Sequence, residues 1–144
     1  YVVGPGYDKK ILEVGTGSGY HTAILAEVFQ NVYTIELLAP MGTAAKKRLT
    51  RMGYDNIKMK IGDGFQGWKE YAPFDAIIVG SSVEKIRKPL MDQLTVGGKL
   101  IIPVSSETHV QELEMLEKPA NKNGEWKKTH LVPVTFPSLV RKKK

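Results

Sequence analysis

None of the 144 residues is a cysteine, which excludes a disulfide framework, a thiolate metal site and a cysteine nucleophile. No apolar run approaches the roughly 18 residues that a membrane-spanning helix requires, and no signal-peptide pattern opens the chain. Histidine is scarce, and the scattered positions of His21, His109 and His130 do not suggest a metal site. These absences predict a soluble, cytoplasmic protein without a bound metal or a membrane partner.

Acidic residues are in the minority, so the chain carries a formal net charge of +6. A positive excess can indicate a nucleic-acid partner, and its position in the sequence decides how much weight it has. Residues 141–144 contribute four of the six charges and leave the rest of the chain close to neutral. A short basic run at a terminus is typical of a solvated tail. We therefore predict a single domain over residues 1–140 with a basic tail at 141–144, and we do not expect nucleic acid as the partner.

The most informative part of the sequence is a glycine-rich stretch between Ile11 and Tyr20. Its first residues, 11–14, include the nearly continuous apolar run of a buried parallel strand. Gly15, Gly17 and Gly19 then allow the backbone to turn sharply and to approach a ligand. Apolar residues at helical spacing follow, so the N-terminus of a helix points toward that ligand. The stretch predicts a cofactor site.

Strand and helix patterns alternate up to residue 104, which predicts an α/β fold with a doubly wound, mostly parallel Rossmann-like sheet. Two further strand patterns follow without a helix between them, which predicts a C-terminal antiparallel hairpin. The predicted strands are 11–14, 32–35, 57–61, 76–79, 99–104, 110–118 and 126–136, and the predicted helices are 20–29, 41–52 and 84–94.

Several cofactors are bound by a glycine-rich turn after a strand, so the alternatives have to be eliminated. The Gly-Lys-Ser/Thr ending of a phosphate-binding P-loop is absent. The dinucleotide fingerprint requires Gly or Ala where this chain has Tyr20, which disfavours nicotinamide and flavin cofactors. Glu13 followed by glycines at alternate positions instead resembles the first motif of class I methyltransferases. These enzymes use S-adenosylmethionine, whose sulfonium and amino groups prefer a nearby carboxylate.

Acidic residues also occur where the second and third strands are predicted to end. Glu36 stands beside the first strand in a wound sheet, where its carboxylate can accept hydrogen bonds from both ribose hydroxyls. Asp63 stands at the next strand end, where it can accept a hydrogen bond from the adenine amino group. A solvated glutamate and a plain turn aspartate are the alternatives.

Taken together, several segments closely resemble the protein-L-isoaspartate O-methyltransferase family. The matching segments are 12–23, 53–56, 62–64, 67–68, 72–79, 97–104 and 131–136. The resemblance implies methyl transfer from S-adenosylmethionine, leaving S-adenosylhomocysteine, to the free carboxylate of L-isoaspartyl residues in damaged proteins, which begins their repair. A carboxylate is already ionised at neutral pH, so its attack on the methyl group needs no general base.

The cofactor-binding residues predicted from the turn, the strand ends and the resemblance are Glu13, Gly15, Thr16, Gly17, Gly19, His21, Glu36, Leu37, Asp63, Gly64 and Gln111. His21 is expected to pack and hydrogen-bond in the first helical turn, and a plain strand role is the alternative for Gln111. No catalytic residue is assigned, because the Thr/Ile-Ser motif of the family lies upstream of the first strand and nothing before Lys10 matches it. Ser81 and Ser82 lie at a strand end and could mimic that hydroxyl donor, but the role expected for them is to cap a helix.

The chain begins with Tyr1 rather than methionine, so we expect the natural protein to begin upstream. Two other functions stay open: a tRNA methyltransferase of the same fold, which the charge favours slightly, and a non-catalytic remnant that serves as a binding module. Without its upstream segment the sheet would expose apolar surface, which predicts a homodimer or aggregation.

Overall fold

The computed structural model describes residues 8–106, 110–121 and 124–138. They form a seven-stranded sheet with the order β3-β2-β1-β4-β5-β6-β7. Its strands are β1 (Lys10–Val14), β2 (Asn31–Glu36), β3 (Ile57–Ile61), β4 (Phe74–Val79), β5 (Leu94–Ser105), β6 (Gln111–Glu117) and β7 (Lys127–Val134). The helices are α1 (Tyr20–Val28), α2 (Ala39–Arg51) and α3 (Lys88–Asp92), with short 3₁₀ helices η1 (Gly64–Gln66) and η2 (Lys69–Tyr71).

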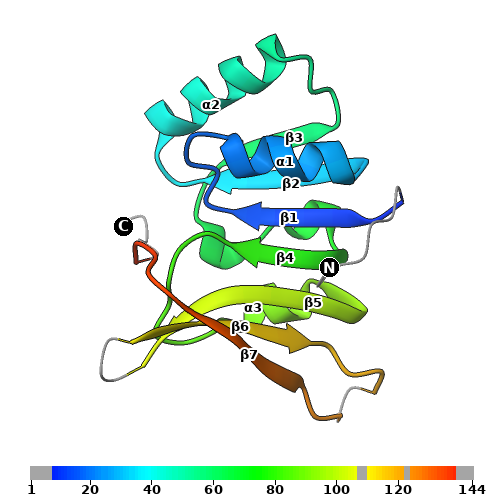
Figure 1. Ribbon diagram of the computed structural model, residues 1–144. Coiled ribbons are helices and arrows are strands. Elements are labelled where there is room, and N and C mark those ends of the chain that lie inside the picture. The colour runs from blue at the N-terminus through cyan, green and yellow to red at the C-terminus, as the bar shows by residue number, and fades with distance from the viewer. Residues whose placement is uncertain (1–7, 107–109, 122–123, 139–144) are drawn as a thin grey trace.

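The pairing of the strands confirms the predicted fold class. Strands β1 to β5 pair in parallel, and β6 and β7 add an antiparallel hairpin to the edge of β5. Figure 1 shows this order from β3 down to β7, with α1 and α2 lying over the half of the sheet that contains β1 to β3. The predicted basic tail at 141–144 and the predicted domain end at residue 140 lie outside the described residues.

Alternation along the strands divides the core between the two faces of the sheet. Ile11 on β1 belongs to the face covered by α1, where it packs in one cluster with Leu25 and Phe29. Leu12, the next residue, belongs to a larger cluster on the opposite face, which includes Phe74. Because both faces are covered around β1, its side chains are all apolar except Lys10 and the buried Glu13. No helix in the described part of the chain is long and apolar enough to cross a membrane.

The helix predicted over 84–94 is wrong in length, because α3 spans only Lys88–Asp92. Val83, just before the predicted start, is instead bound to β5: its N–H donates to the Pro103 carbonyl at 3.0 Å, and its carbonyl accepts from Ser105 N at 2.9 Å. Pro89 lies in the first turn of α3, the helical position that tolerates proline. Ser81 and Ser82 therefore do not cap this helix, whose N-cap residue is Arg87.

The fifth strand is longer at its start than the sequence predicted. It begins at Leu94 and passes through Gly97 and Gly98 before the predicted start at residue 99. The glycines do not break the strand because Lys118 holds it: Gly97 N donates to the Lys118 carbonyl at 2.9 Å, and Lys118 N donates to the Gly98 carbonyl at 2.9 Å. Long-range pairing thus overrides the local tendency of two glycines to end an element.

Candidate functional site

The carboxyl ends of the parallel strands meet at one edge of the sheet (Figure 1). Backbone hydrogen bonds hold the loops that leave them. Gly15 N donates to the Ile35 carbonyl at 2.8 Å, and Gly80 N donates to the Val14 carbonyl at 2.8 Å. The glycine turn is therefore fixed between the ends of β2 and β4, at the edge where open α/β sheets bind their ligands.

The turn adopts a backbone conformation that favours glycine. Gly15, Gly17 and Gly19 have φ angles of 96°, 55° and 83°, all in the left-handed region. Gly19 is also the N-cap residue of α1, and it has no side chain that would press on Leu49 of α2. The alternate glycines are thus explained by the turn itself, as the sequence predicted.

Glu36 connects the end of β2 to this turn. Its Oε2 accepts a hydrogen bond from Gly17 N at 2.8 Å, and its Oε1 accepts one from Leu38 N at 3.0 Å. The residue is 7% exposed, and Leu37 beside it is half-buried. An ionised carboxylate offers about four acceptor positions, so these two bonds leave room for further donors such as ribose hydroxyls.

Glu13 lies beneath the turn on the face covered by α1, and it is 2% exposed. Its Oε2 accepts hydrogen bonds from the hydroxyls of Thr22 at 2.5 Å and Thr34 at 2.7 Å, and its Oε1 is 2.8 Å from His21 Nδ1. The carboxylate thereby joins β1, β2 and the first turn of α1. This geometry supports the position of the helix, whereas contact with a cofactor stays a prediction.

Thr16 extends the same network upward into the turn. Its hydroxyl lies 2.6 Å from the Thr34 hydroxyl, whose own proton is donated to Glu13. Thr16 must therefore be the donor in the first of these bonds. Thr16 is 4% exposed, and this buried hydrogen bond joins the glycine turn to β2.

The Glu13 hydrogen bond raises the pKa of His21 above its usual 6.5, although partial burial acts in the opposite direction. The pair therefore stabilises the fold fully below pH 6.5, and this contribution is lost as the pH rises through the higher pKa of the folded state.

We expect wild-type protein to lose more stability than His21→Gln between pH 6.5 and about pH 8.5. Urea unfolding at both pH values measures the difference, and parallel curves would contradict the assignment.

One residue that supports the turn was missed by the sequence analysis. Arg48, an exposed residue of α2, donates a hydrogen bond from its guanidinium group to the carbonyl oxygen of Ser18. The contact joins α2 to the glycine turn over thirty positions of sequence. The residues around a basic side chain on an exposed helix face do not indicate such a contact, so the sequence could not predict it.

Asp63 and Gly64 follow β3 at the same edge of the sheet. Asp63 Oδ1 accepts a hydrogen bond from Phe65 N at 2.9 Å, so the residue caps η1. This is the turn role that the sequence left open, and hydrogen bonding to an adenine amino group stays a prediction. Gly64 is buried against β1, where an added Cβ would lie 2.3 Å from Val14 Cγ1.

We expect Gly64→Ala to lower the free energy of unfolding by about 1–3 kcal/mol, because the added methyl group overpacks a buried strand. Gly62→Ala is the matched control. Its Cβ would meet only the mobile end of Lys60, at 3.2 Å, so a change within about 0.5 kcal/mol is expected. Urea denaturation measures both, and equal effects would show that packing against Val14 is not the reason for glycine at position 64.

Gln111 lies at the start of β6 and binds the segment that follows β7. Its Oε1 accepts from Phe136 N at 2.6 Å, and its Nε2 donates to the Phe136 carbonyl at 3.0 Å. The same Nε2 donates to Ser82 Oγ at 3.1 Å, and Ser82 is 2% exposed. Gln111 and Ser82 thus hold the C-terminal segment beside the end of β4. Contact of Gln111 with the cofactor stays a prediction.

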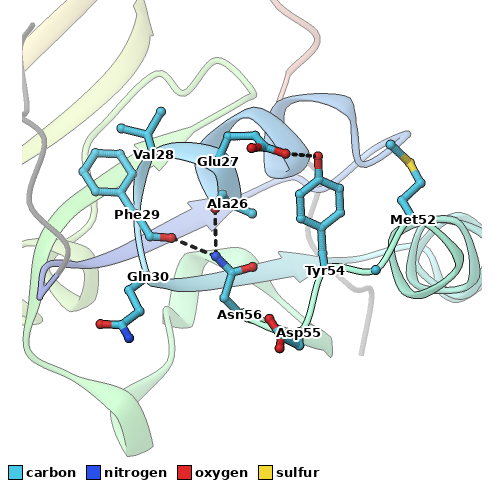
Figure 2. A pocket seen from close by; sticks show the side chains of 10 residues that line it. Ala26, Glu27, Val28, Phe29, Gln30, Met52, Tyr54, Asp55 and Asn56 are labelled. Carbon is cyan, nitrogen blue, oxygen red and sulfur yellow. Dashed lines mark hydrogen bonds between the residues drawn. The ribbon is translucent and has the colours of Figure 1, made fainter.

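A surface hollow of about 440 Å³ lies beside the amino ends of β2 and β3, at the opposite ends of the strands from the glycine turn. Figure 2 shows the Tyr54 hydroxyl directed at Glu27, 2.7 Å from Oε1. It also shows the Asn56 amide between the carbonyl oxygens of Ala26 and Phe29, at 2.8 and 2.9 Å. Asn56 therefore satisfies carbonyls at the end of α1, which explains the 53–56 motif structurally. The hollow is separate from the glycine turn.

Comparison with known proteins agrees with this geometry. Residues 6–144 match the family model described as Protein-L-isoaspartate(D-aspartate) O-methyltransferase. The chain is 45% identical over 137 residues to Protein-L-isoaspartate O-methyltransferase 2 of a Polaromonas species, covering 95% of this chain and 63% of the relative. It is 46% identical over 134 residues to the protein of the same name from Syntrophobacter fumaroxidans, covering 93% of this chain and 53% of the relative.

A solved structure is similar over nearly the whole chain. It comes from Plasmodium falciparum, is assigned to the same enzyme class and is in complex with S-adenosyl-L-homocysteine. The TM-score is 0.80 at 30% identity, and the match covers 98% of this chain and 69% of that one. The chain spans about half to two thirds of the length of the two curated relatives. With the family model matched from residue 6 onward, the chain belongs to the protein-L-isoaspartate(D-aspartate) O-methyltransferase family.

Proposed function

We propose that the chain binds S-adenosylmethionine at the carboxyl edge of β1 to β3 and serves methyl transfer to the free carboxylate of L-isoaspartyl residues in damaged proteins. The observation that carries the proposal is the left-handed glycine turn held by Glu36 through Gly17 N at 2.8 Å. The acidic end of β2 beside this turn suits a ribose, whereas the turn lacks a P-loop lysine for phosphate. Asp63 lies at the next strand end, and a carboxylate has acceptor positions beyond the one that Phe65 N occupies on Oδ1.

S-adenosylmethionine supplies an electrophilic methyl group on a positively charged sulfur. The chain's own contribution is to hold that cofactor in place. Arg48, Thr16 and Glu36 fix the turn from three sides, so little reorganisation is needed when the cofactor binds. The substrate carboxylate is ionised at neutral pH and releases no proton on attack, so no protein base is required.

Matched peptides that differ only in an aspartyl or isoaspartyl linkage test the reaction. We expect transfer of labelled methyl groups to the isoaspartyl peptide alone. Equal transfer to both peptides would remove the substrate assignment, and transfer to bulk tRNA would favour the other enzyme class. Binding of S-adenosylhomocysteine without transfer to any acceptor would identify this chain as a binding module.

We further propose isoaspartyl-containing proteins as partners in the cytoplasm, without a nucleic-acid or membrane partner. The absence of cysteine and the near-neutral body of the chain support this proposal.

Self-association through exposed apolar surface is a further part of the proposal. Tyr20, Ile24 and Val28 form a stripe on α1 and are 75%, 44% and 43% exposed. Ile101 and Met115, paired across β5 and β6, are only half-buried. We expect sedimentation to show dimers or larger species as concentration rises. A stable monomer at high concentration would contradict this expectation.

A further inference from the structure

The antiparallel hairpin brings together three potential metal ligands that are far from the glycine turn. Glu112 and Glu114 stand two positions apart on β6, so they share one face of the sheet. His130 of β7 is directly opposite Glu114 in the register. Since β6 and β7 lie at the other end of the strand order from β2 and β3, the group is separate from the candidate cofactor site (Figure 1).

The side chains converge as closely as their register suggests. His130 Nδ1 lies 2.6 Å from Glu112 Oε2 and 4.0 Å from Glu114 Oε1. One ligand atom from each residue falls within 4.8 Å of the others. Imidazole nitrogens and carboxylate oxygens are both ligands that proteins use for Zn²⁺ and related divalent ions.

Glu114 provides an independent observation. The residue is 5% exposed, and its Oε2 is buried without a hydrogen-bond partner among the residues that the structure describes. Its Oε1 contacts the Lys128 ammonium at 2.7 Å, so the carboxylate already attracts one cation. A buried acceptor without a donor is costly, and more so when it is charged. The oxygen nearest His130 is Oε1, and the unpartnered Oε2 belongs to the same carboxylate, so a second cation bound by this carboxylate would lower the cost of burying it.

We propose that Glu112, Glu114 and His130 bind a divalent transition-metal ion, with Zn²⁺ as the expected occupant. The ion takes the place of the proton shared between His130 Nδ1 and Glu112 Oε2, and it is bound by the Glu114 carboxylate, whose Oε1 lies 4.0 Å from His130 Nδ1. Lys128 keeps its contact with the other Glu114 oxygen. Three protein ligands leave an open coordination position for water. The site is independent of the proposed methyl transfer.

Calorimetric titration of the whole chain with zinc chloride tests the proposal, in buffer without chelator. We expect one ion per chain, and an affinity that falls when the pH is lowered because a protonated imidazole does not bind the metal. Glu112→Gln and His130→Gln should each weaken binding by about tenfold or more. Both side chains are largely exposed, at 48% and 60%, so neither change should prevent folding, and circular dichroism checks this.

Glu117→Gln is the matched control, since Glu117 belongs to the same strand but alternates to the opposite face. It should bind zinc as the wild type does. The proposal is overturned if zinc produces no binding heat up to about millimolar concentration, the weak limit of specific affinity. It is equally overturned if Glu112→Gln and His130→Gln bind zinc as tightly as the control. The isoaspartyl assay is not involved, so the two proposals fail independently.

Discussion

Replacing Glu13 with alanine is expected to lower the free energy of unfolding by about 3 kcal/mol or more. The change removes the acceptor of the Thr22 and Thr34 hydroxyls, which are both fully buried. It also leaves a cavity between β1 and α1. Chemical denaturation measures the loss, and Glu13→Gln should fall between alanine and wild type because it keeps the volume and one acceptor oxygen.

Glu27→Ala provides the control for this experiment. Glu27 is exposed on the same helix and accepts a hydrogen bond from the Tyr54 hydroxyl, which is itself at the surface, so its removal should change stability by less than about 0.5 kcal/mol. If Glu13→Ala proved as mild as the control, Glu13 would not be the centre of a structural network. A direct role toward the cofactor would then be the better interpretation.

Glu36→Ala is expected to weaken binding of S-adenosylhomocysteine by about 100-fold or more. The substitution removes the acceptor of Gly17 N, which loosens the turn, and also the acceptor proposed for the ribose hydroxyls. Hydrogen bonds to a charged group contribute about 1.5–3 kcal/mol each, so losing two accounts for the effect. Calorimetry on the wild type and the variant measures it.

The control for the binding experiment is Glu70→Ala, which removes an exposed carboxylate in η2 and should leave affinity unchanged. Glu36→Gln retains one acceptor oxygen and should bind with intermediate affinity. Equal affinity in wild type and Glu36→Ala would refute the proposed cofactor site. The absence of any binding to the wild type would refute it as well. Unfolding curves for each variant separate a weakened site from a damaged fold.

Much of this fold could be predicted because its signals are local. Buried parallel strands require apolar runs, and left-handed turns favour glycine, so the segment from β1 to α1 was identified from its own residues. The positions of Glu36 and Asp63 at strand ends followed from the rule that parallel strands end at one edge. The α/β class and the C-terminal hairpin followed from the change in alternation after residue 104.

Errors arose where partners distant in sequence override local preference. The extra strand at 94–98 depends on Lys118, and the short α3 depends on the pairing of Val83 with β5. Neither contact can be inferred from nearby residues, because it is set by strand order and register. A helical pattern with a glycine pair after it therefore misled the prediction for this region.

The roles of individual polar residues required the same long-range information. The sequence predicted Glu13 as a ligand for the cofactor. Only the register of β1 with β2 shows that it also lies beside Thr34 in a buried network. Gln111 meets Phe136, and Glu114 meets His130, only because β6 and β7 pair with each other, with a shift of register between Leu113 and Glu114. Local patterns thus established the turn, the strands and the family of this chain, whereas the pairing of distant segments established which polar groups meet. The physical reason is that hydrophobic periodicity depends on residues close together in the sequence, whereas hydrogen-bond partners depend on how the whole sheet packs.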